Sequence, residues 1–169
     1  TIAPRLNAAS RMDDPRLAFE LLSTTDPAHA MALAKELTAL NDQRKKAVAL
    51  MMREIRTSIT SRELREVIVI GNPKWRVGIV GLAAGTLAEE FGRPVFVWGR
   101  EGGEIIKGSC RSDGATNMVD LMVAAGDVFI DKGGHEFSGG FSVSHEQVHN
   151  LEDALVLAHR TLYPKGTTR

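Results

Sequence analysis

The residues of this sequence best suited to chemistry are a histidine and the glycines around it. Gly133, Gly134 and His135 open the stretch Gly-Gly-His-Glu-Phe-Ser-Gly-Gly, which is separated by two residues from the apolar run 128–130. Glycines at this density let another molecule approach the backbone closely, because no Cβ stands in the way. Two interpretations follow. The stretch is either a tight turn with a hydrogen-bonded histidine, or a turn whose amides and imidazole meet a phosphate or a base.

A second polar cluster, residues 108–112, could share the same ligand. Ser109, Arg111 and Ser112 supply hydroxyl donors and a guanidinium fork, which suit a phosphate. Alternation along a strand predicts that Ser109 and Arg111 face one side, while Cys110 and Ser112 face the other. Cys110 is expected to be a small residue packed on the strand rather than a nucleophile. Together, the two clusters predict a pocket for an anionic ligand.

Two further groups of basic residues occur near the start of the chain. Arg5, Asn7 and Arg11 are separated by small residues, so their side chains could converge on one target or occupy a surface turn. The second group lies on one polar face of a predicted helix and comprises Arg44, Lys45, Lys46, Arg53 and Arg56. That face is either solvated or tracks the phosphates of a nucleic acid.

Composition limits the function classes. The 169 residues carry 21 Lys and Arg against 21 Asp and Glu, so no global field attracts nucleic acid or a membrane. Nucleic-acid binding would therefore need a local patch. One cysteine allows no internal disulfide, which suits a reducing cytoplasm. The sequence has neither a signal peptide nor an apolar run of about 18 residues, so we expect no membrane partner. His135, His145 and His149 form no recognised metal-binding spacing.

The elements that must position these residues alternate between strands and helices. The predicted strands are 67–70, 94–98, 104–110 and 137–143. The predicted helices between and after them are 77–91, 117–125 and 151–162. This order is typical of the α/β class. The glycine-rich residues 100–103 predict a hairpin-like turn, and hence a mixed sheet.

The first 66 residues contain no glycine and predict helices. A short helix is expected over Pro15–Leu22, capped by Asp13 or Asp14. A long helix is expected over Pro27–Ile59, since Asp26 and Pro27 match a cap followed by proline at the first helical position. The chain begins at Thr1 without an initiator methionine, which is what we expect of a fragment or a processed product.

Four motifs give the chain a resemblance to RecJ, the single-strand-specific 5′ to 3′ exonuclease family of the DHH phosphoesterase superfamily. The motifs are 4–11, 75–81, 108–112 and 133–135, in the family's order and spacing. The resemblance implies three parts: residues 1–26 as the remnant of the DHH lobe, 27–66 as a long connecting helix, and 67–169 as a DHHA1 domain. The implied fold is a mixed sheet flanked by helices.

The resemblance also implies a function. The chain would be the single-stranded-DNA-binding portion of a nuclease, a phosphodiester hydrolase of DNA repair and recombination in the cytoplasm. Enzymes of this family hold two manganese or magnesium ions with Asp and His residues of an N-terminal DHH lobe. No DHH tripeptide or Asp-x-Asp motif occurs here. We therefore expect no metal in this chain, no activity when it is alone, and a missing DHH lobe as its partner.

Site residues follow from the same resemblance. Arg5, Asn7 and Arg11 match a motif that borders the active site and helps to bind substrate phosphates. The residues that match those facing that site across the cleft are Ser109, Arg111, Ser112 and His135, and Gly133 and Gly134 of the same motif are expected to bind nucleic acid with them. Their implied role is to hold the DNA strand. Arg76 stands where the family usually has a histidine, and could replace it as a phosphate ligand.

Two alternatives stay open. One is a stand-alone, non-catalytic DHHA1 module that binds nucleic acid or a protein, as DHHA1 domains do in alanyl-tRNA synthetases. The other is part of a small-nucleotide phosphodiesterase, although the motif at 4–11 and the long helix favour RecJ. Without a DHH lobe, the apolar face of the long helix could pair with another copy to form a homodimer.

Overall fold

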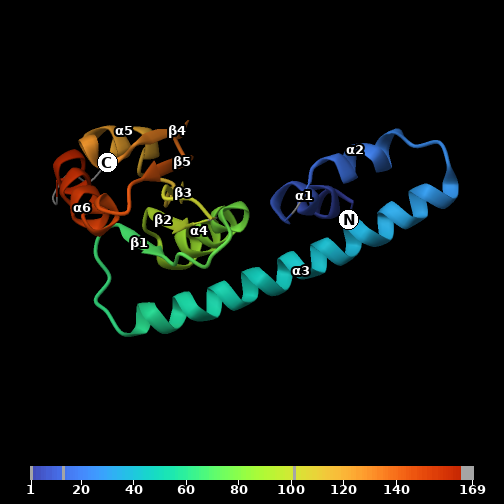
Figure 1. Ribbon diagram of the computed structural model, residues 1–169. Helices are drawn as coiled ribbons and strands as arrows, with labels where there is room; N and C mark the ends of the chain where they lie inside the picture. Colours follow the sequence, from blue (N-terminus) through green and yellow to red (C-terminus); the bar gives the residue numbers. More distant parts are fainter. Residues whose placement is uncertain (1, 13, 101, 165–169) are drawn as a thin grey trace. The chain divides into compact units, whose positions relative to one another are not determined.

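The computed structural model describes residues 2–12, 14–100 and 102–164. It divides within its longest helix, α3 (Pro27–Thr60), into two compact units, Thr1–Glu54 and Ile55–Arg169 (Figure 1). Within the described ranges, no helix combines the length and the apolar character that crossing a bilayer requires.

The first unit is helical. It contains α1 (Ala3–Met12), α2 (Arg16–Ser23) and most of α3, so both predicted helices of this region are confirmed. The Asp14 carboxylate accepts a hydrogen bond from the Arg16 amide at 2.9 Å, at the start of α2. The other predicted cap, Asp13, lies outside the described residues. The stretch 4–11 is helical and forms no surface turn, which fits its alanines and leucine and a proline in the first turn.

The second unit is built on a mixed sheet, as predicted, but the sheet has five strands rather than the four predicted from the sequence. Its strands lie in the order β1-β2-β3-β5-β4. Their bounds are β1 (Ile68–Gly71), β2 (Val95–Gly99), β3 (Ile106–Arg111), β4 (Asp131–His135) and β5 (Ser138–Val143). β1 and β2 are parallel, and every other neighbouring pair is antiparallel.

Helices cover the two sides of this sheet unequally. The remaining helices are α4 (Val77–Phe91), α5 (Met118–Ala124) and α6 (Leu151–Leu162), with short turns η1 (Gly126–Val128) and η2 (Gln147–His149). α5 and α6 pack together on one side, while α4 contacts β2 and β3 on the other (Figure 1). The outward side of β3, β5 and β4 is therefore only partly covered.

The core lies under α5 and α6. Phe141 of β5 is buried there, with its ring centroid 5.5 Å from that of Phe96 and 5.7 Å from that of Phe129. Leu121 of α5 and Leu155 of α6 are fully buried in the same cluster. These side chains fix which side of β3 and β5 points inward, and so which side points outward.

The glycine stretch is a β-hairpin, and its first strand, β4, was not predicted. β4 ends at His135 and β5 begins at Ser138, so Glu136 and Phe137 form a two-residue turn. The Met118 amide donates to the Glu136 carbonyl at 2.8 Å, which ties the turn to α5. Glycine has a low preference for strands, so composition alone predicted a turn where pairing with β5 makes a strand.

Cys110 is buried in the core, as predicted, and burial raises the pKa of its thiol to about 12. The thiolate is the reactive form, so alkylation by iodoacetamide at pH 8 should be negligible in the native protein and complete after unfolding in guanidinium chloride. Mass spectrometry of the two samples measures the difference. Rapid labelling of the native protein would contradict the burial of this side chain.

Candidate functional site

Alternate residues of three neighbouring strands form a polar sheet surface, which we call the open face. Its members are Lys107, Ser109 and Arg111 of β3, Ser138, Gly140 and Ser142 of β5, and Asp131, Gly133 and His135 of β4. All nine are half-buried or exposed, and none has a large apolar side chain. A sheet surface of this kind does not need a covering helix, and it can meet a polar ligand.

The strand register brings the two clusters predicted from the sequence onto this one face. Arg111 pairs with Ser138, and Ser138 pairs with His135 across the hairpin. Neighbouring strands lie about 4.8 Å apart, so the Cα atoms of Arg111 and His135 are about 10 Å apart. A guanidinium and an imidazole at this separation can contact the same ligand.

The next row of the open face consists of Ser109, Gly140 and Gly133, so its centre is bare backbone. A Cβ added at Gly133 would meet nothing within 4 Å, and one added at Gly140 would find its nearest atom at 3.8 Å. Packing within the domain therefore does not require glycine at either position. Gly134 differs, because its Cβ would collide with the Ser138 carbonyl oxygen. Gly134 maintains the hairpin, while Gly133 leaves space above it.

Helix α4 borders the face beside Ser109 and Arg111. A Cβ on Gly81 would lie 3.1 Å from a guanidinium nitrogen of Arg111 and 3.2 Å from the Ser109 hydroxyl. Gly81 thus makes room for both side chains. Arg111 also donates to the Cys110 carbonyl at 2.7 Å. Among the described residues, its guanidinium has no other hydrogen-bond partner, which leaves donors for a ligand.

Ser112, in contrast, belongs to a loop. Its hydroxyl donates to the Thr116 carbonyl at 2.6 Å and accepts from the Gly114 amide at 2.9 Å. In the next residue, burial opposes ionisation of Asp113, but amide donors, those of Thr116 and Ala115, hold its pKa below the usual value. The predicted alternation of side chains along β3 is confirmed, and Ser112 lies off the open face.

Arg76 lies at another border of the open face. It is exposed and immediately precedes α4. A Cβ on Gly99 would collide with the Trp75 carbonyl, so the start of α4 lies directly over Gly99. Gly99 pairs with Lys107 of β3. Arg76 is therefore near the Lys107 end of β3, away from Arg111.

Arg5, Asn7 and Arg11 belong to the first unit and lie on α1. Asn7 and Arg11 are one helical turn apart and share a side of the helix. Arg5 points more than about 100° away from both. The helix therefore does not gather all three side chains on one target. The possibility that they converge rested on the small residues between them and took no account of helical geometry.

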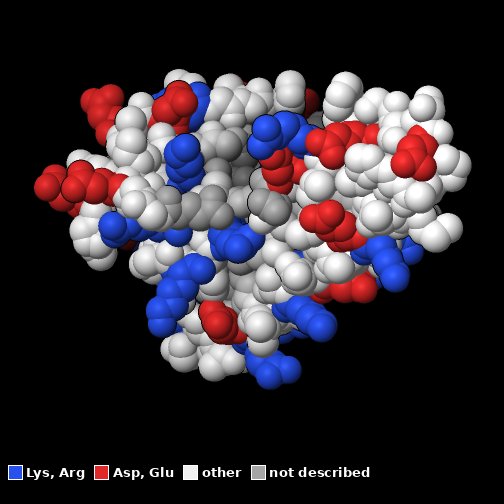
Figure 2. All heavy atoms as spheres, turned by 45° about the vertical axis from the view of Figure 1, so that its right-hand side comes forward, with Lys and Arg blue, Asp and Glu red and all other residues white. Residues whose placement is uncertain are grey.

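The basic residues of α3 have neighbours that favour a solvated, ion-paired surface. Lys45 lies 3.7 Å from Asp42, and Arg44 donates to the Asn41 side chain at 3.1 Å. Arg56 pairs with Glu90 at 3.0 Å. In the face shown in Figure 2, basic and acidic side chains both occur across the surface. This distribution agrees with a net charge of zero, and leaves local patches as the sites for an anion.

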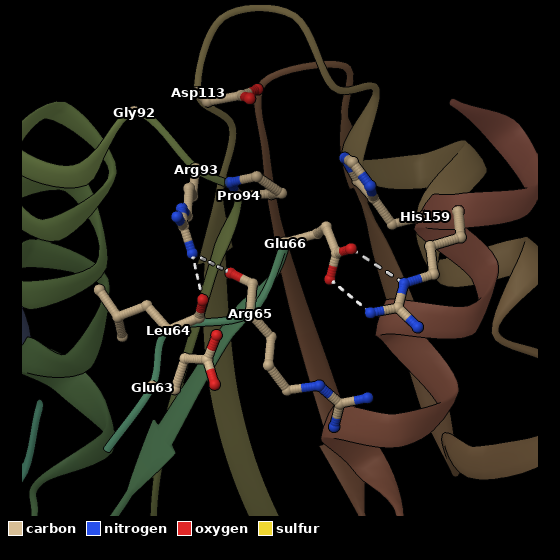
Figure 3. Close-up of a pocket in the computed structure, with 10 residues that line it drawn as sticks. Glu63, Leu64, Arg65, Glu66, Gly92, Arg93, Pro94, Asp113 and His159 are labelled. Atoms are coloured by element: carbon tan, nitrogen blue, oxygen red, sulfur yellow. Dashed lines mark hydrogen bonds and ion pairs between the residues drawn. The ribbon is translucent and has the colours of Figure 1, made fainter. Parts of the chain in front are cut away.

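A cavity of about 780 Å³ lies beyond the starts of β1 and β2, against α6 (Figure 3). Arg160 pairs there with Glu66 at 2.9 Å, and Arg93 donates to the Leu64 carbonyl at 2.7 Å. Burial lowers the pKa of His159, which also lines the cavity. Since these two arginines are occupied with protein groups, we favour the open face as the anion site.

The part of the chain that the structure describes contains no group of three His, Cys, Asp or Glu side chains able to hold a metal ion. His145 and His149 are exposed around η2, with ring centroids 6.0 Å apart. The described residues therefore do not fit a manganese or magnesium site.

Comparison with known proteins gives consistent matches. Residues 64–162 match the DHHA1 domain. The chain is 34% identical to the single-stranded-DNA-specific exonuclease RecJ of Bacillus subtilis over 156 residues, which is 91% of this chain and 20% of that protein. It is 32% identical to RecJ of Thermus thermophilus over 163 residues, which is 96% of this chain and 23% of that protein.

Solved structures agree. A crystal structure of exonuclease RecJ bound to manganese matches with a TM-score of 0.82 and 31% identity, covering 94% of this chain and 40% of that one. RecJ from Thermus thermophilus in complex with Mg²⁺ matches with a TM-score of 0.85 and 31% identity, covering 94% and 25%. The chain thus spans a small part of each relative. The expected homodimer finds no support in these comparisons.

Proposed function

Since this chain belongs to the DHHA1 domain family, we propose that its open face binds single-stranded DNA as part of a RecJ-like exonuclease. The strand register supports the proposal, because Ser109, Arg111 and His135 lie around the bare backbone of Gly140 and Gly133. Guanidinium groups make strong paired hydrogen bonds to phosphate. Exposed glycine backbone lets a flat base or a sugar lie close to the sheet.

The wider assembly is part of the same proposal. RecJ structures are described with manganese or magnesium, whereas the described residues here do not fit such a site. A DHH lobe outside this chain would hold those ions and activate water, so we propose that this chain alone does not hydrolyse DNA. Work in DNA repair and recombination in the cytoplasm would follow from that assembly. A stand-alone module and a small-nucleotide phosphodiesterase are less favoured, because the relatives reported above are RecJ.

The predicted site residues are proposed to contribute in different ways. The principal DNA contacts are Arg111, Ser109 and His135, with the backbone of Gly133. Arg76 is proposed as a further phosphate contact at the border of the open face, and Arg5, Asn7 and Arg11 as phosphate contacts made by α1. Gly134 shapes the hairpin, and Ser112 shapes the loop after β3, so both act through structure.

Arg111→Ala should weaken binding of a fluorescent single-stranded oligonucleotide by at least about tenfold at low salt, since a hydrogen-bonded charge contact is lost. His135→Ala should weaken it by a smaller factor, because an imidazole offers a ligand fewer hydrogen-bond donors than the guanidinium of Arg111. Fluorescence anisotropy measures both affinities.

Arg160→Ala is the matched control for Arg111→Ala. It removes the same charge from α6, on the opposite side of the sheet, and breaks an exposed ion pair of small value. Affinity should stay within about twofold of the unaltered chain, as expected for a distant charge screened by salt. If Arg111→Ala and Arg160→Ala bind equally well, the open face is not the DNA site.

A further inference from the structure

Lys107 occupies the open face, yet the sequence motifs did not point to it. It lies on β3 in the same alternation as Ser109 and Arg111, and it is exposed. Its ammonium group has no hydrogen-bond or ion-pair partner among the described residues, whereas Lys132, on the other side of the sheet, donates to the Gly126 carbonyl at 3.1 Å. Lys107 is thus a cation directed at solvent beside the proposed DNA site.

The position of Lys107 connects two parts of the site. Same-side residues of a strand are about 6.7 Å apart, so Lys107 and Arg111 lie about 13 Å apart along β3. The spacing of about 6.7 Å between same-side residues is close to the distance between neighbouring phosphates of a stretched DNA single strand. Arg76 lies beside the Lys107 end, where the start of α4 covers Gly99. Arg111 and Lys107 therefore follow β3, and Arg76 lies beside the Lys107 end, towards the neighbouring strand β2.

The third row of the open face indicates the direction of the path. Lys107 pairs with Ser142, and Ser142 pairs with Asp131 on β4. Asp131 lies about 10 Å from Lys107, and its carboxylate repels phosphate. A DNA strand that crossed the sheet in this row would meet the negative charge of Asp131. A DNA strand that followed β3 would keep its phosphates near Lys107 and Arg111.

Resting on the function proposed above, we propose that Lys107 binds a further phosphate of the same DNA strand. The bound strand then runs along β3, from Arg111 towards the start of α4. This assigns to the open face a track for a single strand, in addition to the contacts around His135. Proteins that bind single strands without sequence preference use such a positively charged groove along the backbone.

The test compares Lys107→Gln with Lys132→Gln in the full chain. Both changes remove one positive charge from neighbouring rows of the same sheet, on opposite sides. Binding of an oligothymidylate is measured by anisotropy across a series of salt concentrations, and thermal melting checks that each variant is folded. Loss of one phosphate contact should reduce the slope of log K against log salt by about 0.7. We expect this reduction, with an affinity loss of about three- to tenfold at low salt, for Lys107→Gln and not for Lys132→Gln.

The outcomes separate this inference from the proposed function. Lys107→Arg keeps the positive charge. If it shows the same slope of log K against log salt as the unaltered chain, while Lys107→Gln does not, the result supports a phosphate contact rather than a structural role. If Arg111→Ala weakens binding but Lys107→Gln keeps the slope of the unaltered chain, the track along β3 is overturned and the open face remains the DNA site. If the unaltered chain does not bind the oligonucleotide, both proposals fall.

Discussion

Gly134→Ala is expected to lower the free energy of unfolding by about 3 kcal/mol or more, at the upper end of the cost of overpacking. The added Cβ would collide with backbone atoms of Ser138 and Gly139 across the hairpin. Backbone atoms cannot move aside as the end of a flexible side chain can. The φ angle of Gly134, 156°, is also one that residues with a side chain rarely adopt. Urea unfolding followed by circular dichroism measures the loss.

The neighbouring change, Gly133→Ala, is the matched control. Its Cβ would point into open space, so the chain should keep its stability, or gain slightly because the unfolded chain becomes less flexible. Binding of single-stranded DNA should nevertheless weaken, since the methyl group would protrude from the open face beside His135 and Gly140. Equal destabilisation by the two changes would show that the register between β4 and β5 is wrong.

Elements with strong periodicity were predictable from the sequence. The helices over 27–59 and 77–91 and the buried strands over 67–70 and 94–98 all have apolar patterns that match their period, and the structure contains each of them. The alternation of Ser109 and Arg111 against Cys110 was predictable for the same reason. In these segments, local pattern and tertiary packing favour the same structure.

The features that were missed depend on how segments pair and coil, which the preferences of single residues do not determine. β4 is a strand because β5 pairs with it, although its sequence, Asp-Lys-Gly-Gly-His, has little intrinsic strand preference. The register that aligns β3 with β5 and β4 shows that Lys107 lies on the open face. Because Lys107 alternates along β3 with Ser109 and Arg111, the sequence could have indicated that it faces the same side. Arg5, Asn7 and Arg11 could have converged on one target, but the helical geometry of α1 turns Arg5 away from the other two.

The residue opposite Lys132 on β5, Phe141, connects the stability of the fold to the site. Phe141→Ala should lower the free energy of unfolding by about 3–5 kcal/mol, the usual cost of removing a buried phenylalanine. The ring is 5% exposed, contacts Phe96 and Phe129, and packs so closely over Gly108 that a Cβ there would collide with it. A loss of this size is a large part of the stability of a typical domain.

The same change at Phe137, in the turn of the same hairpin, gives a control of identical chemistry. Phe137 is 56% exposed, so Phe137→Ala should alter the free energy of unfolding by no more than about 0.5 kcal/mol. Because Gly140 and Ser142 flank Phe141 on β5, the cavity left by Phe141→Ala should also loosen the open face and weaken DNA binding under conditions where the chain is still folded. Urea unfolding and anisotropy on both variants test this link. Comparable losses at the two positions would mean that the aromatic cluster does not hold β5 in place.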